Sequence, residues 1–219
     1  MQAERPAPPP LIMPLLQQTY EIWSLEASWF LFYGFFMLAA AYAAGQVPIA
    51  GLALSLALDG PLLGGLVLAT RRILLQERPE AQDFMGGFRR ALPLAMLSLL
   101  ISALTLLGLV LAIVPGLIVA ALLSVAAPVL LLEGGGLRSC LEVSARLVRP
   151  RLWPVVALVV AQAALQVLLA LPAMNALLQG QEATLTQALP LFLGLGLLGP
   201  FHGILSVVLY QRLRSELDL

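Results

Sequence analysis

The sequence predicts an all-α integral membrane protein, a bundle of six transmembrane helices arranged as three hairpins. Three observations predict this fold. Of the 219 residues, 60% are hydrophobic and only 11% are charged, and long apolar stretches recur along the chain. A soluble domain is nearer half apolar and about a quarter charged. A water-soluble fold could not bury this much apolar surface, so we expect lipid to be the solvent.

Six stretches approach the roughly 20 apolar residues that a helix needs to cross a bilayer. They are residues 28–46, 48–70, 91–114, 115–132, 152–174 and 188–210. Residues 1–27 are expected to form a cytoplasmic lead-in with an interfacial segment, and residues 211–219 a cytoplasmic tail. The membrane domain between them spans residues 28–210 and leaves no length for a second domain.

The basic residues, all arginines, sort to one side of this six-span pattern. They lie before the first span, between the second and third, between the fourth and fifth, and after the sixth: Arg5, Arg71, Arg72, Arg78, Arg89, Arg90, Arg138, Arg146, Arg149, Arg151, Arg212 and Arg214. Because cytoplasmic loops carry the excess of positive charge, both termini are expected in the cytoplasm. Abundant Leu, Ala, Gly and Arg without Lys is typical of a GC-rich bacterial genome, which makes the bacterial inner membrane the expected location.

An amphipathic stretch precedes each predicted hairpin. The clearest is residues 137–152, which place Leu137, Leu141, Val148 and Leu152 on one helical face, with Cys140 and Ala145 beside them, and Arg138, Glu142, Arg146 and Arg149 on the other. The second ends in Arg89 and Arg90, opposite Phe84, Met85 and Phe88. The third, before the first span, includes Leu15, Leu16, Ile22 and Trp23.

Such helices lie in the headgroup layer with their arginines near anionic phospholipids. Seating in the lipid bilayer is one interpretation of these stretches. Docking of a protein partner, or a homo-oligomer, is the other. The parallel between Arg89-Arg90-Ala-Leu-Pro93 and Arg149-Pro-Arg151-Leu-Trp-Pro154 hints at an internal duplication, although any entry from cytoplasm to membrane tends to look like this.

Two ionisable side chains fall inside the predicted spans. Asp59 lies in the second span and His202 in the sixth, each flanked by a glycine pair and a proline. Ionisable residues in a membrane are expensive and are functional candidates. The two residues lie at similar depth, so we expect them to approach each other if the second and sixth spans are neighbours.

Neutral polar residues recur at helical spacing in other spans. Gln162 and Gln166 share one helical face, and Ser102 lies on a polar face with Ser98 and Thr105. With Asp59 and His202, the residues Gln162, Gln166 and Ser102 are the predicted lining of a ligand site or ion pathway. The competing interpretation is that these groups make interhelical hydrogen bonds that hold the bundle together.

The sequence carries no motif of a known catalytic or cofactor site. It has one histidine and one cysteine, too few for a His-based or Cys-based metal site within one chain. Nucleotide, protease and hydrolase fingerprints are absent from the sequence, and the zero net charge does not attract nucleic acid. We therefore expect no enzyme, no cofactor, no metal and no nucleic acid.

Several short segments carry a family resemblance. They are residues 84–90, Val114-Pro115-Gly116 followed by Pro128 and Glu133, residues 141–147 with Ser144, and the ending Leu209-Tyr210-Gln-Arg212-Leu-Arg214. From about residue 60 onward the chain resembles poorly characterised bacterial multi-pass proteins, which include the YciC-like inner-membrane family and the membrane domain associated with glycerophosphodiester phosphodiesterases. The resemblance implies a six-helix membrane fold and supplies no catalytic residues.

Besides a lipid-modifying enzyme, which the lack of catalytic motifs disfavours, two functions remain open from the sequence. The first is a membrane factor without enzymatic activity that acts through lipid or a partner protein. The alternative is a small transporter or channel that uses the region of Asp59 and His202.

Overall fold

Helices make up the regular structure of the described part of the chain. The computed structural model describes residues 11–45, 51–179 and 185–217. Its elements, in chain order, are α1 (Ile12–Leu25), α2 (Ala27–Gly45), α3 (Gly51–Leu74), α4 (Ala81–Arg89), α5 (Ala91–Leu111), α6 (Ile113–Leu122), α7 (Ala126–Leu132), α8 (Leu137–Val148), the 3₁₀ turn η1 (Arg149–Arg151), α9 (Leu152–Leu178) and α10 (Leu185–Leu217). The predicted all-α class is confirmed.

Five stretches of described residues are long and apolar enough to cross a bilayer. They are Leu54–Leu74, Ala91–Leu111, Ile113–Leu132, Leu137–Pro172 and Phe192–Leu217. A sixth is present if α1 and α2 are taken as one span bent by 93°. These five or six apolar spans support a membrane location and the predicted membrane bundle.

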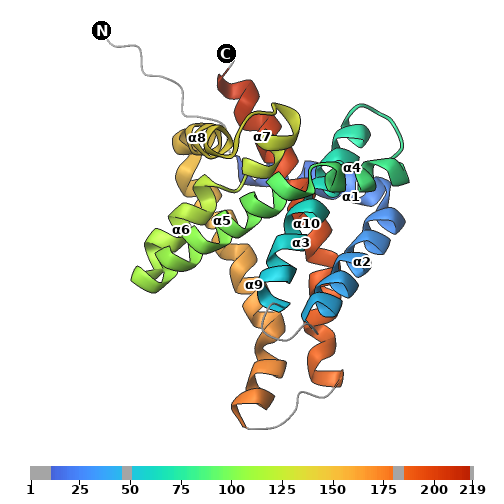
Figure 1. The fold of residues 1–219 in the computed structure, drawn as a ribbon, viewed down its shortest axis with the longest axis vertical. Helices are drawn as coiled ribbons and strands as arrows, with labels where there is room; N and C mark the ends of the chain where they lie inside the picture. Colours follow the sequence, from blue (N-terminus) through green and yellow to red (C-terminus); the bar gives the residue numbers. More distant parts are fainter. Residues whose placement is uncertain (1–10, 46–50, 180–184, 218–219) are drawn as a thin grey trace.

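The short amphipathic helices gather at one end of the bundle. Helices α1, α4 and α8 lie across this end, each directly before a long helix (Figure 1). With α7 and the C-terminal turns of α3 and α10, they form what we call the packed end. The arginines of the described residues belong to the elements and loops of this end, as the sorting of charge along the sequence predicted. The hairpins α5–α6 and α9–α10 extend away from it, and we call their far ends the hairpin tips.

Helices α3 and α10 are central and contact most of the other helices. Small residues set how closely their neighbours approach. A Cβ atom at Gly34 of α2 would overlap the carbonyl of Gly196 in α10. This carbonyl has no helical hydrogen-bond donor, because the residue four positions later, Pro200, lacks an N–H group. A Cβ atom at Gly203 of α10 would overlap the side chain of Leu66 in α3. Both close approaches lie next to the membrane-embedded polar residues of α3 and α10.

The fourth predicted span, residues 115–132, lies within the apolar stretch Ile113–Leu132, which is divided between two helices. Helix α6 ends at Leu122 and α7 begins at Ala126, with a turn between them. Pro128, in the first turn of α7, has no N–H to donate to the carbonyl of Ser124. A break just before this proline removes the need for that hydrogen bond.

The predicted boundaries of other elements also shift. Helix α10 continues to Leu217, so the described part of the expected tail is helical rather than a separate segment. Helix α9 runs on to Leu178, past the expected end of the fifth span. Residues 1–10 of the expected lead-in, and residues 46 and 48 at the ends of the first two predicted spans, lie outside the described residues.

The buried face of α8 is rotated about the helix axis by about one residue relative to the predicted apolar face. Its buried residues are Cys140, Ser144, Leu147 and Val148, whereas Leu137 and Leu141 are only half-buried. The face therefore points into the packed end and not into lipid. The reason is Ser144, whose hydroxyl has a partner inside the protein.

Candidate functional site

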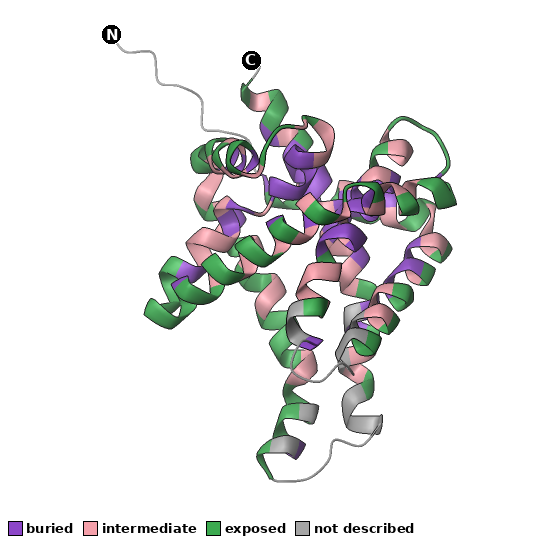
Figure 2. Ribbon diagram, viewed as in Figure 1, coloured by how far each residue is buried: buried purple, intermediate pink, exposed green. Residues whose placement is uncertain are grey.

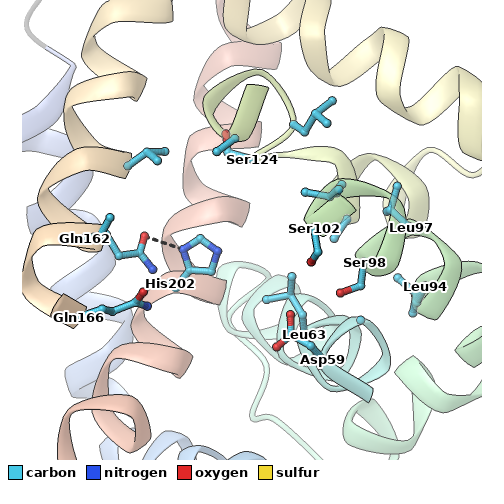
Figure 3. Close-up of a pocket in the computed structure, with 17 residues that line it drawn as sticks. Asp59, Leu63, Leu94, Leu97, Ser98, Ser102, Ser124, Gln162, Gln166 and His202 are labelled. Atoms are coloured by element: carbon cyan, nitrogen blue, oxygen red, sulfur yellow. Dashed lines mark hydrogen bonds between the residues drawn. The ribbon is translucent and has the colours of Figure 1, made fainter. Parts of the chain in front are cut away.

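A cavity of about 270 Å³ lies inside the membrane-spanning part of the molecule, between α3, α5, the α6–α7 break, α9 and α10 (Figure 3). Most of its lining is apolar. Its polar lining residues come from four helices and the break: Asp59, Ser98, Ser102, Ser124, Gln162, Gln166 and His202. A mostly apolar cavity with a few convergent polar groups is the usual form of a small-molecule site.

A second cavity, of about 340 Å³, adjoins the first on the side of α2. The two share the lining residues Asp59, Leu63, Gln162, Gln166 and His202. These five side chains therefore stand between two hollow regions. The polar groups among them are accessible from either cavity.

Asp59 lies on α3 and forms part of the cavity wall. The next residue, Gly60, packs so closely on α5 that a Cβ atom would overlap the carbonyl of Leu94. This close approach brings Ser98, one helical turn after Leu94, opposite the carboxylate. The Ser98 hydroxyl is in position to donate a hydrogen bond to Asp59. No arginine lines either cavity among the described residues.

Helix α10 presents His202 from the opposite side of the cavity. Its Nδ1 atom lies 2.8 Å from Oε1 of Gln162 on α9. Since the amide oxygen is an acceptor, Nδ1 carries the proton, and Nε2 of a neutral ring keeps its lone pair. Figure 3 shows that this second ring nitrogen points into the cavity. Gln162 thus fixes the ring so that an acceptor faces the hollow.

The break between α6 and α7 forms another part of the wall. Leu123 and Ser124 of the turn line the cavity, and the Ser124 hydroxyl donates to the carbonyl of Ala121 at 2.8 Å. From α8, the Ser144 hydroxyl donates to the carbonyl of Leu122 at 2.7 Å. Irregular backbone at membrane depth is tolerated where it is enclosed by protein or lines a cavity, and here it does both.

The five residues predicted for a ligand site or ion pathway, Asp59, His202, Gln162, Gln166 and Ser102, line the same cavity. Asp59 and His202, which we expected to approach each other, line the same two cavities, and they form no ion pair with each other among the described residues. Each has a different partner, because Gln162 takes the imidazole and Ser98 faces the carboxylate.

Sequence reasoning missed two of the lining hydroxyls. Ser98 was noted on a polar helical face but was not proposed for the site. Ser124 was not considered, although a serine four residues before Pro128 in an apolar stretch is a signal of a broken helix. The remaining hydroxyl of the α5 polar face, that of Thr105, is buried without a hydrogen-bond partner among the described residues.

The arginines predicted to contact headgroups do not all behave alike. Arg146 and Arg149 are exposed on the outer side of α8 and its following turn, and Arg89 is exposed at the end of α4. Arg138 is exposed and forms an ion pair with Glu142 at 2.8 Å. Arg90 is also exposed, and it donates to the carbonyl of Leu130 in α7 at 3.1 Å, which links the start of α5 to α7 within the packed end.

Comparison of the chain with protein-family models, with curated proteins and with solved structures returns no match. The resemblance to the YciC-like family therefore stays a prediction from the short segments quoted above.

Proposed function

We propose that the chain is a small transporter of the bacterial inner membrane that binds a polar solute between α3 and α10. One observation carries the proposal: seven polar side chains from four helices and the α6–α7 turn converge on an otherwise apolar hollow. Some of these groups also join helices, as His202 of α10 joins Gln162 of α9, but the cavity beside them gives a solute access to their remaining hydrogen-bonding atoms.

The backbone around the cavity supports the same function. The α6–α7 stretch is broken beside Ser124, and α3 and α10 contain Pro61 and Pro200 within continuous helices. Discontinuous helices near the midplane are a common way for secondary transporters to build solute sites, since the break frees backbone groups and allows the halves to move. One such break and two helices with an internal proline surround this cavity.

Uptake into liposomes tests the proposal. Purified protein is reconstituted and uptake of a panel of radiolabelled neutral, cationic and anionic small solutes is compared with empty liposomes. Ala163→Phe fills the cavity, and we expect it to abolish uptake of the transported solute. Ala103→Phe, on the exposed side of α5, is the matched control and should transport normally. Uptake of no solute, or equal uptake by Ala163→Phe, would contradict the proposal.

A second candidate is a membrane factor that acts through anionic lipid or a partner protein. It is favoured by the exposed arginines Arg146 and Arg149 on the outer side of the packed end. Both candidates agree with termini in the cytoplasm and with positive charge on that side. The uptake experiment separates the two, since a factor of this kind has no need of the cavity and shows no uptake that Ala163→Phe removes.

A further inference from the structure

We infer that the ligand of the cavity is a small organic cation, an ammonium group carried on a compact apolar body. This inference rests on the proposed function of the cavity as a solute site and adds the chemical class of the solute. It follows from the sign of the charge in the cavity, from the direction of the hydrogen-bonding groups and from the apolar character of the remaining wall.

The charge in the cavity has one sign. Asp59 is the one acidic group in the lining, and no arginine reaches either cavity from the described residues. The arginines of the described residues are held at the packed end, where Arg72, Arg151 and Arg214 pair with acidic residues. A carboxylate inside a membrane protein is strongly favoured by a nearby positive charge. A cationic ligand supplies that charge, whereas an anionic ligand would be repelled.

The hydrogen-bonding groups suit a ligand that donates. Gln162 holds His202 with Nε2 turned into the cavity as an acceptor, and the carboxylate of Asp59 accepts from the other side. The hydroxyls of Ser98, Ser102 and Ser124 can each accept through a lone pair. An ammonium group has three donors and no acceptor, so it matches these groups without leaving a donor unpaired.

The rest of the wall is apolar and limits the size. Leu63, Leu97, Ile101 and Val159 line the same hollow of about 270 Å³. This volume falls at the lower end of the range of small-molecule pockets. A hydrated metal ion would leave these side chains against water, whereas a ligand with an apolar body would cover them. The combination favours an organic amine over an inorganic cation.

Three probes of equal shape and different charge test the inference. Benzylammonium, benzyl alcohol and benzoate are titrated by calorimetry into the full chain in lipid nanodiscs, with empty nanodiscs as the blank. We expect benzylammonium to bind, and the neutral and anionic probes to bind at least about tenfold more weakly. Asp59→Asn should raise the Kd of benzylammonium by about thirtyfold, which corresponds to the loss of one partner of a buried charge pair. Glu142→Gln removes a carboxylate outside the cavity and should change nothing.

The outcomes separate the inference from the proposed function. Binding of benzyl alcohol or benzoate that equals or exceeds benzylammonium, and that is lost in Ala163→Phe, overturns the cationic class and leaves the cavity as a solute site. Benzylammonium binding that Asp59→Asn leaves unchanged also overturns it. Failure of benzylammonium to bind overturns the inference whatever the uptake panel gives. Should Asp59→Asn not fold, Ser98→Ala is used in its place, and binding unchanged by that variant counts against the inference.

Discussion

The packed end and the hairpin tips are stabilised by different partners. At the packed end, Leu147, Val148 and Leu213 are almost fully buried, and Arg151 pairs with Glu216 at 3.0 Å. At the tips, apolar residues are exposed, with 77% of Val110 and 82% of Leu178 accessible. Figure 2 shows the same gradient from buried to exposed.

The difference teaches where protein contacts stabilise this fold. A side chain buried against protein gains packing contacts that lipid does not supply. An apolar side chain at a tip contacts lipid in the folded and in the unfolded protein, so it contributes little to stability. The Tyr210 hydroxyl donates to Glu133 at 2.8 Å, and Arg214 lies 3.6 Å from the same carboxylate. The packed end should therefore dominate the free energy of unfolding, and the tips should tolerate substitution.

The largest expected effect is at the contact between α3 and α4. A Cβ atom at Gly87 would overlap the carbonyl of Pro61 and lie 2.5 Å from the amide nitrogen of Gly65. Backbone atoms cannot yield as a side chain does, so Gly87→Ala should destabilise the chain by about 3 kcal/mol or more. The control is Gly199→Ala, which meets nothing within 4 Å. Size-exclusion chromatography and thermal unfolding in detergent measure both, and equal melting temperatures would contradict the comparison.

The next effect comes from truncating one leucine buried against protein and one exposed leucine near a hairpin tip. Leu66 is fully buried in α3, whereas Leu106 of α5 is 63% exposed. Leu66→Ala should cost about 3 kcal/mol, the usual penalty for a cavity in a packed interior. Leu106→Ala should cost less than about 0.5 kcal/mol, as at an unpacked surface. Titration with sodium dodecyl sulfate in mixed micelles measures both free energies of unfolding. Similar losses at the two positions would show that the tips are packed against protein after all.

The smallest effect sharpens the comparison within α8. Ser144→Ala removes the hydrogen bond to the carbonyl of Leu122, and a buried acceptor left without its partner costs about 1–3 kcal/mol. Ser139→Ala, on the exposed side of the same helix, should leave the free energy of unfolding within about 0.5 kcal/mol of the wild-type value. The same micelle titration compares them. If the Ser144→Ala variant is as stable as the Ser139→Ala variant, the hydrogen bond from α8 does not stabilise the turn between α6 and α7.

Apolar length predicted the fold class because it determines whether a helix partitions into lipid. It could not predict the break at residues 123–125, since Leu123, Ser124 and Val125 keep the stretch nearly as apolar as its neighbours. The orientation of α8 depended on that break. Ser144 is buried only because the broken helix offers it the carbonyl of Leu122, a partner that periodicity does not reveal.

The residues of the candidate site could be predicted from the sequence only in part. Polar residues inside spans are few, so Asp59, His202 and the glutamines could be selected from composition and spacing. Their pairing could not, because it depends on how the helices rotate about their axes. Position along the helix suggested that Asp59 and His202 lie at a similar depth. Their hydrogen-bond partners depend on helix packing, which places Gln162 next to His202 and Ser98 opposite Asp59.

Helix α10 has a consequence for bilayer thickness. Its 33 residues extend about 50 Å at 1.5 Å each, well beyond a hydrocarbon core of about 30 Å. The last two turns carry Arg212, Arg214 and Glu216, so about 10 Å of this excess is polar sequence at the packed end. His202 then lies about 12 Å below Tyr210, close to the midplane. A thinner bilayer is accommodated by a larger tilt of α10. The anchored C-terminal turns stay at their depth, and the hairpin tips move sideways through the lipid.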